Sequence, residues 1–188
     1  MEPIRKAELV KATIAEIGAA GSLDVTVGQI ARRAGMSSAL AHHYFGGKEQ
    51  MFLAAMRHIL MLYGVGVRSA LKDAEGPRAR LEAVIRTSFA PVEFRREVVG
   101  AWLTFYVLAQ RVPEAKRLLR IYQQRLHSTL VHDLRPLIGQ RAPGVAEGLG
   151  AMIDGVYLRE ALKEDVPDGA AAAEMVLAYL AAEVGRNE

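Results

Sequence analysis

The stretch ARRAGMSSALAHHYFGGKEQMF, residues 31–52, concentrates residue types that can do chemistry. Imidazoles such as His42 and His43 can bind a metal ion or transfer a proton. Adjacent side chains on a helix point about 100° apart, so this pair is poorly placed to share one metal. Only Glu49 adds a carboxylate nearby, and neither an oriented nucleophile nor a carboxylate pair is present. We therefore expect no metal, no cofactor and no enzymatic activity, and two interpretations remain: a partner-binding surface or a plain structural hairpin.

An aromatic group lies in the segment GAWLTFYVLAQ, residues 100–110. Trp102, Phe105 and Tyr106 have the i, i+3, i+4 spacing that places side chains on one face of a helix. Core packing is the simplest role for such a face. A binding role needs a second feature.

Asp154 supplies that feature in the segment GLGAMIDGVYLREAL, residues 148–162. Its helical neighbours, Tyr157 among them, are mostly apolar or small, and an unpaired buried carboxylate costs several kcal/mol. Asp154 therefore needs a hydrogen-bond network, a shifted pKa or a cation, for which Arg86 and Arg120 are candidates. Aromatic faces with one carboxylate also suit a quaternary ammonium ligand. The expected ligand-binding residues are Trp102, Phe105, Tyr106, Asp154 and Tyr157.

The composition of the 188 residues is that of a globular protein, with 51% hydrophobic and 24% charged residues and no cysteine. Disulfides and thiolate metal sites are thereby excluded. We see no signal peptide and no continuous apolar run close to the roughly 20 residues of a membrane span. A cytoplasmic protein without membrane contact is the default expectation. The net charge of +3 indicates a polyanionic partner only weakly, so any nucleic-acid surface must be local.

Helical periodicity extends along nearly the whole chain, and strand or hairpin signals are missing. Prolines and glycines divide the chain into three short helices followed by six longer ones, about nine in all. Thr26 is placed to cap the second, and Ser37 or Ser38 the third. The expected spans are 3–20, 27–34, 38–44, 48–74, 77–90, 95–110, 113–134, 143–163 and 168–183. The sequence predicts an all-α fold.

Two of the short helices, joined at Gly35, have the outline of a helix-turn-helix over residues 26–45. Ala41 and Tyr44 can face inward, which leaves the hydroxyl-rich start of the second helix exposed for a DNA major groove. Lys48 opens a long helix, where a cation and free backbone N–H groups both favour phosphate. The expected DNA-binding residues are Thr26, Ser37, Ser38, His42, His43, Tyr44 and Lys48.

Residues 26–52, TVGQIARRAGMSSALAHHYFGGKEQMF, resemble the N-terminal signature of the TetR family of bacterial regulators. The resemblance implies a DNA-binding domain at residues 1–47 and a helical effector-binding and dimerisation domain at residues 48–188. The family usually has an aromatic residue where this chain has His42, and a histidine where it has Tyr44. The phosphate contact made by that aromatic is therefore in doubt at His42.

Beyond this signature, the segments AWLTFY and IDGVYLREAL, residues 101–106 and 153–162, resemble BetI-type regulators, the choline-responsive repressors of glycine-betaine synthesis genes. The resemblance implies a homodimeric repressor that binds a pseudo-palindromic operator and a small cationic effector, choline. We expect the last two helices to form the dimer interface because they are rich in small and apolar residues. The alternatives are a TetR-type repressor for another lipophilic or cationic effector, such as an efflux regulator, and a helical scaffold.

Overall fold

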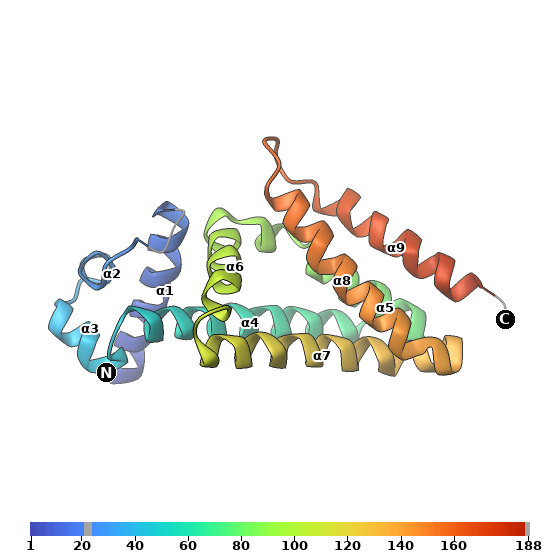
Figure 1. Cartoon of the computed structure of the whole chain (residues 1–188), viewed down its shortest axis with the longest axis horizontal. Coiled ribbons are helices and arrows are strands. Elements are labelled where there is room, and N and C mark those ends of the chain that lie inside the picture. Colours follow the sequence, from blue (N-terminus) through green and yellow to red (C-terminus); the bar gives the residue numbers. More distant parts are fainter. Residues whose placement is uncertain (21–23, 187–188) are drawn as a thin grey trace. The chain divides into compact units, whose positions relative to one another are not determined.

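The computed structural model describes residues 1–20 and 24–186, and all regular structure within them is helical (Figure 1). This confirms the all-α prediction for the described residues. They form nine α-helices and two 3-10 helices. The bounds are α1 (Glu2–Ala20), α2 (Val27–Arg33), α3 (Ser38–Phe45), α4 (Lys48–Lys72), α5 (Gly76–Ser88), η1 (Pro91–Phe94), α6 (Arg96–Ala109), α7 (Pro113–Ile138), η2 (Gly139–Arg141), α8 (Ala142–Ala161) and α9 (Gly169–Gly185).

Side-chain caps explain where α2 and α3 begin. Thr26 and Gln29 form a capping box, in which each side chain accepts a hydrogen bond from the backbone amide of the other residue. Ser37, and not Ser38, caps α3 by accepting a hydrogen bond from an amide of the first turn at 3.2 Å. Gly35 between the helices has a φ of +66°, a conformation that costs glycine little. These local signals confirm the predicted helix-turn-helix geometry.

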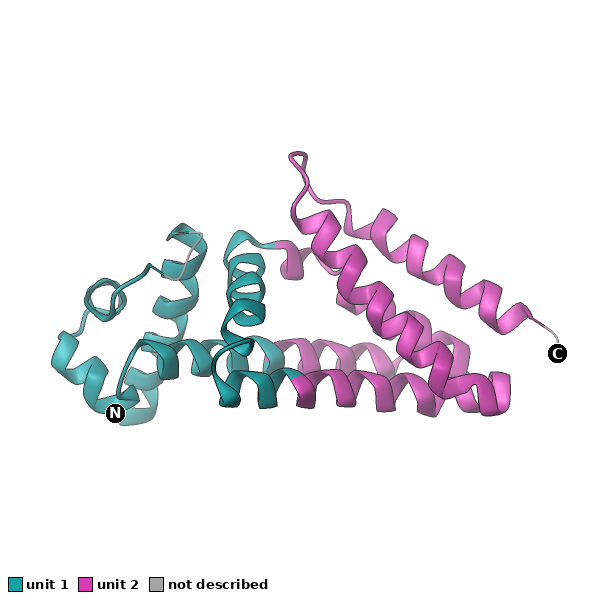
Figure 2. Ribbon diagram, viewed as in Figure 1, with its two compact units in different colours: residues 1–61, 95–119 teal, residues 62–94, 120–188 magenta. Residues whose placement is uncertain are grey.

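Two compact units make up the chain, and the first contains residues 1–61 and 95–119 (Figure 2). In this unit α1 packs against α6 and α2, and α2 packs against α3. Gly18 allows α1 to approach α6, since a Cβ on it would lie 2.4 Å from the Glu97 Cα. The two compact units do not coincide with the predicted DNA-binding domain, residues 1–47, and effector-binding domain, residues 48–188. That division by function stays a prediction. Around the helix-turn-helix the buried core residues are Leu9, Ala12, Val25, Ile30, Ala31, Ala41 and Met51.

The second compact unit contains residues 62–94 and 120–188. In it α9 packs along α8, and α5 contacts both helices. The Arg80 Nε donates a hydrogen bond to Asp133 at 2.8 Å, and Asp133 is only 3% exposed. The Arg141 guanidinium at the start of α8 donates to the Glu183 carboxylate near the end of α9, at 2.7 Å. These ion pairs join helices that are distant in the sequence.

The structure differs from the expected helices in several places. Neither 3-10 helix, η1 or η2, was predicted, and α7 continues beyond its predicted end at residue 134, through Pro136, to Ile138. Proline cannot donate the helical hydrogen bond, which usually ends or kinks a helix. Here Leu130, Leu134 and Ile138 recur every four residues and are buried, so packing of this face stabilises the extra turn.

Within the residues that the structure describes, α4 is the one helix long and apolar enough to cross a membrane by length and composition. A core helix of a soluble protein can pass the same test. The first half of α4 buries several large side chains, among them Met51, Phe52, Leu53 and Met56. The first half of α4 therefore belongs to the core.

Candidate nucleic-acid interface and ligand site

The third helix, α3, presents a polar face to solvent. Ser38, His42 and His43 are exposed, while Ala41 is completely buried and Tyr44 is half-buried against the core of the unit. The exposed set includes the first turn of the helix, which contacts base edges when such a helix enters the major groove. The predicted inward and outward faces of α3 are therefore confirmed, whereas individual contacts with DNA stay predictions.

Several of the predicted DNA-binding side chains also make contacts within the protein. The Thr26 hydroxyl is hydrogen-bonded to Gln29 at 2.9 Å, and the Ser37 hydroxyl accepts the capping hydrogen bond of α3. The His42 Nδ1 lies 3.2 Å from the Gly46 carbonyl oxygen, which leaves its other ring nitrogen for a partner. A Lys6 ammonium lies 5.7 Å from the centre of the Tyr44 ring. Tyr44 thus helps to position α3 on α1.

Lys48 is the first residue of α4 and is exposed, as the sequence predicted. The chain reaches it through Gly46, whose φ is +76°. Free amides at a helix N-terminus together with a lysine form a suitable phosphate contact. Of the two arginines on α2, Arg33 pairs with Glu16 of α1, while Arg32 is exposed.

The aromatic group of α6 lies in the first compact unit. Trp102 has its ring centre 6.0 Å from that of Phe105 and 5.8 Å from that of Tyr106. Phe105 is completely buried and Trp102 is 7% exposed, so both contribute to packing. Asp154 and Tyr157 belong to the second unit. A shared role of the two groups in binding one ligand stays a prediction.

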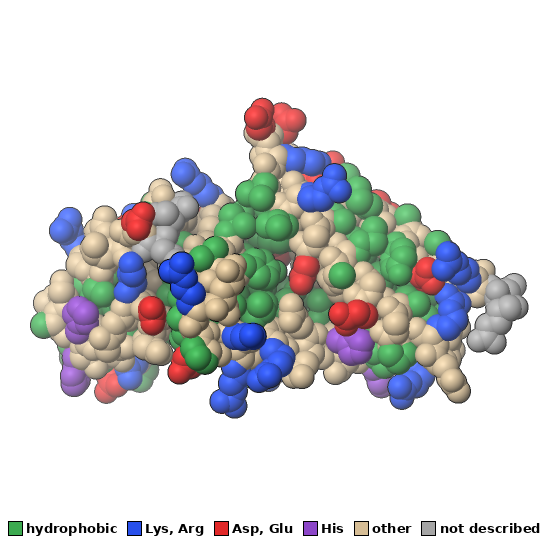
Figure 3. Space-filling view, in the orientation of Figure 1, with side chains coloured by type: hydrophobic (Ala, Val, Ile, Leu, Met, Phe, Trp, Pro, Cys, Tyr) green, Lys and Arg blue, Asp and Glu red, His purple; other side chains and the backbone are tan. Residues whose placement is uncertain are grey.

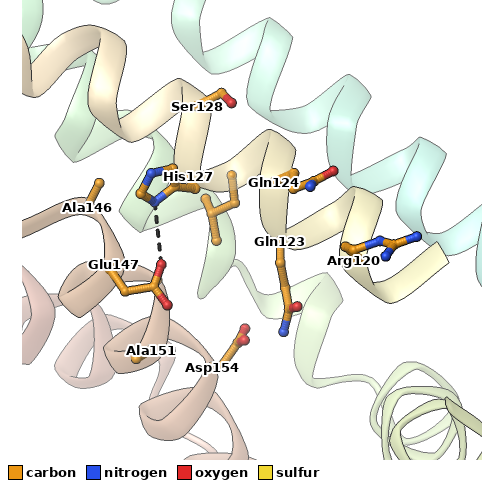
Figure 4. A pocket seen from close by; sticks show the side chains of 11 residues that line it. Arg120, Gln123, Gln124, His127, Ser128, Ala146, Glu147, Ala151 and Asp154 are labelled. Atoms are coloured by element: carbon orange, nitrogen blue, oxygen red, sulfur yellow. Dashed lines mark ion pairs between the residues drawn. The ribbon is translucent and has the colours of Figure 1, made fainter. Parts of the chain in front are cut away.

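Asp154 on α8 is largely buried, and among the described residues it forms no ion pair. The Tyr122 hydroxyl of α7 donates a long hydrogen bond to Asp154 Oδ1, at 3.5 Å. Burial raises the pKa of Asp154 to about 6, and this hydrogen bond only partly opposes the rise. Neither arginine considered from the sequence compensates the negative charge of Asp154. Arg86 pairs with Glu174 at 2.8 Å, and Arg120 points away from Asp154 (Figure 4).

Asp154 and two tyrosines that the sequence analysis missed, Tyr63 and Tyr122, form a cluster that we call the Asp154 cluster. Tyr63 of α4 packs edge-on against Tyr122, with ring centres 6.0 Å apart. The Tyr63 hydroxyl lies 2.8 Å from the Ser88 hydroxyl. Burial raises the pKa of Tyr63 to about 12, and the negative charges of Asp154 and Glu93 add to the rise. These residues lie far apart in the sequence, and no local pattern distinguished them from ordinary core tyrosines.

A cavity of about 720 Å³ opens between α7 and α8 in the second unit (Figure 4). Each helix lines it with an i, i+3, i+4, i+7 face. At one end the His127 Nδ1 lies 3.5 Å from a Glu147 carboxylate oxygen. At the other end Gln123 and Asp154 point toward the same space (Figure 4). The main lining residues are Arg120, Gln123, Gln124, His127, Glu147, Gly150, Ala151 and Asp154.

Comparison with protein families connects both sites to transcription. Residues 9–55 match the model of bacterial regulatory proteins of the tetR family. Residues 77–185 match the model described as BetI-type transcriptional repressor, C-terminal. The first match contains the helix-turn-helix, and the second contains Asp154, Tyr122 and the cavity.

Individual proteins that are similar to this chain are also transcriptional regulators. The HTH-type transcriptional regulator BetI of Brucella suis is 54% identical over 182 residues, which is 96% of this chain and 92% of that protein. The regulator of the same name from Rhizobium meliloti is 49% identical over 87% of this chain and 81% of its own. Among solved structures, a transcriptional regulator from Pseudomonas aeruginosa has a TM-score of 0.85 at 25% identity, over 98% of this chain and 93% of its own. A regulator from Saccharomonospora viridis, solved in complex with choline, has a TM-score of 0.82 at 20% identity, over 93% of this chain and 94% of its own. The chain therefore belongs to the tetR family of bacterial transcriptional regulators and, within it, to the BetI-type repressors.

Proposed function

We propose that this repressor is a cytoplasmic homodimer that binds a pseudo-palindromic operator, controls glycine-betaine synthesis genes and responds to choline at Asp154. The observation that supports a response to choline is the environment of the Asp154 carboxylate. It is largely buried beside tyrosines, and no cationic side chain pairs with it in residues 1–20 and 24–186. A cation from outside the protein would compensate its charge.

The chemistry of the cluster suits a trimethylammonium group. Such a group has no N–H to donate, so aromatic faces and one opposite charge satisfy it. Each desolvated ring contributes up to about 2 kcal/mol, and the tyrosines of α4 and α7 bring two rings near Asp154. The choline complex of the Saccharomonospora viridis regulator supports the idea that this fold can hold such a ligand.

Titration calorimetry with choline tests the site. We expect Asp154→Asn to weaken binding by about tenfold or more, because it removes the opposite charge. Glu147→Gln is the matched control, since Glu147 also lines the cavity but contacts His127. Equal affinity of wild type and Asp154→Asn would remove Asp154 from the site. Titration of the Tyr106→Leu variant tests separately whether the α6 aromatic group takes part in choline binding.

Ethanolamine serves as the comparison ligand, because its small ammonium group requires hydrogen bonds that rings cannot supply. We expect choline to bind more tightly. If wild type binds neither compound, the alternative of another cationic or lipophilic effector is favoured, and the polar lining of the cavity makes cations the first class to screen.

The proposed DNA contacts rest on α3 and Lys48. The exposed Ser38 and His43 are candidates for reading base edges, and Lys48 for a phosphate. A two-fold dimer places two such helices at half-sites about one turn of DNA apart. For choline to regulate binding, it must favour one dimer geometry over another. Fluorescence anisotropy with operator DNA, with and without choline, tests this coupling.

The proposed dimer interface is the outer face of α8 and α9. Several residues behind this expectation, such as Ile153, Val176 and Leu180, are buried within the protomer's own core. Others remain exposed, including Ala171 and Met175, which is 57% exposed. Figure 3 shows hydrophobic side chains gathered over α8 and α9 on the displayed face. A small-residue, apolar surface of this kind supports helix pairing between two copies.

A further inference from the structure

The cavity between α7 and α8 is larger than a ligand as small as choline requires. Its volume is about 720 Å³, which lies within the range of about 300–1,000 Å³ that is typical of sites for drug-sized molecules. Because its lining residues recur at i, i+3, i+4 and i+7, the cavity extends along about two turns of each helix. Such a cavity suits an elongated ligand.

A carboxylate lies at each end of this cavity, and both belong to α8. Asp154 is at one end, and Glu147, seven residues earlier in the sequence, is at the other (Figure 4). A helix rises about 1.5 Å per residue, so the two residues are about 10 Å apart along the helix axis. The Glu147 carboxylate lies 3.5 Å from the His127 ring, but its side chain is 82% exposed and remains accessible to a ligand.

The rest of the lining favours cations that donate hydrogen bonds. Gln123 and Gln124 of α7 contribute side-chain amides, whose oxygen atoms accept hydrogen bonds. Arg120 also lines the cavity but points away from Asp154 (Figure 4). None of the described residues that line it is a phenylalanine, a tyrosine or a tryptophan. Asp154 is thus bordered by Tyr122 on one side and by this polar cavity on another.

We propose that this cavity is a second cation site, which binds a linear aliphatic diamine by its two ammonium groups, one at Asp154 and one at Glu147. A primary ammonium group has three N–H bonds to donate, and carboxylate and amide oxygens accept them. The small residues Gly150 and Ala151 line the cavity between the carboxylates, and a Cβ on Gly150 would meet nothing within 4 Å. This space accommodates the aliphatic chain. The proposed choline response uses the tyrosine side of Asp154, so the two proposals share only this residue.

Calorimetric titration at pH 8 and low ionic strength tests the site with three amines. Heptamethylenediamine is the probe, because its extended chain separates the ammonium groups by about the spacing of the two carboxylates. Heptylamine has the same chain with one ammonium group, and trimethylenediamine has two groups that are too close to span the cavity. Wild type should bind heptamethylenediamine about threefold or more tighter than either control, because only this probe pairs with both carboxylates.

Three variants assign the contacts. Glu147→Gln should remove the advantage of heptamethylenediamine over heptylamine and leave choline binding unchanged. Glu147→Asp keeps the negative charge and should keep most of the advantage. Asp154→Asn should weaken heptamethylenediamine binding about tenfold or more, because this carboxylate is the more buried of the two.

The outcomes separate this inference from the proposed function. If heptamethylenediamine binds no more tightly than heptylamine, or binds wild type and Glu147→Gln equally, the second cation site is refuted, whatever the affinity for choline. If choline does not bind but the diamine keeps its advantage, only the choline response fails. An equal thermal midpoint of Glu147→Gln and wild type would show that loss of the charge, and not of the fold, removes the advantage.

Discussion

Lowering the pH from 8 to 5 should weaken choline binding by at least about tenfold, because the ligand requires an ionised Asp154. The pKa of this carboxyl is raised to about 6, so about one molecule in ten is ionised at pH 5 and nearly all are ionised at pH 8. The affinity therefore falls as the pH falls through this value.

Calorimetry between pH 5 and pH 8, in two buffers of different ionisation enthalpy, measures both affinity and proton release. We expect about one proton or more to leave per choline bound at pH 5, and close to none at pH 8. Circular dichroism at each pH checks that the protein remains folded.

Other charged groups near Asp154 determine the controls. Burial raises the pKa of Tyr63 to about 12, so this phenol remains neutral in the interval, and Arg120 points away from Asp154. His127 lies on the cavity wall next to Glu147 and is the control for the histidines. His127→Gln should keep the pH dependence, and Asp154→Asn should lose most of it. A constant affinity from pH 5 to pH 8, or an unchanged profile in Asp154→Asn, would refute the reasoning.

Four further outcomes follow from single side chains. Asp154→Asn should raise the free energy of unfolding at pH 8 by about 1–3 kcal/mol, because the folded-state pKa lies above the unfolded value of 3.8 and ionisation destabilises the fold. In urea titrations this gain should vanish below about pH 4, and Glu147→Gln should change stability by less than about 0.5 kcal/mol. Lys48→Ala should weaken binding to all DNA sequences alike and reduce the salt slope by about one, as measured by anisotropy; an unchanged slope would contradict the placement of this residue at a phosphate. Met175→Asp should shift sedimentation toward the monomer, whereas a stable dimer would exclude this face of α9. Gly35→Ala should cost about 1 kcal/mol, since only its positive φ opposes a side chain there, and no loss in thermal midpoint would contradict this.

Much of the N-terminal fold was predictable because its signals are local. Thr26 and Gln29 are three residues apart, and their capping box requires nothing from the rest of the chain. Gly35 marks a turn by its own backbone freedom, and the alternation of small and apolar residues decided which face of α3 would be buried. The same local reasoning failed at Pro136, where burial of Leu130, Leu134 and Ile138 outweighs the missing hydrogen bond.

For the ligand site, the sequence by itself determined that Asp154 lies on a largely apolar helical face and needs compensation. Only the tertiary structure decided how that need is met. It pairs Arg86 with Glu174, turns Arg120 away, and brings Tyr122 to the carboxylate. The physical reason is that periodicity reports which side of a helix is buried, whereas the groups opposite that side come from helices whose pairing depends on the packing of the whole unit.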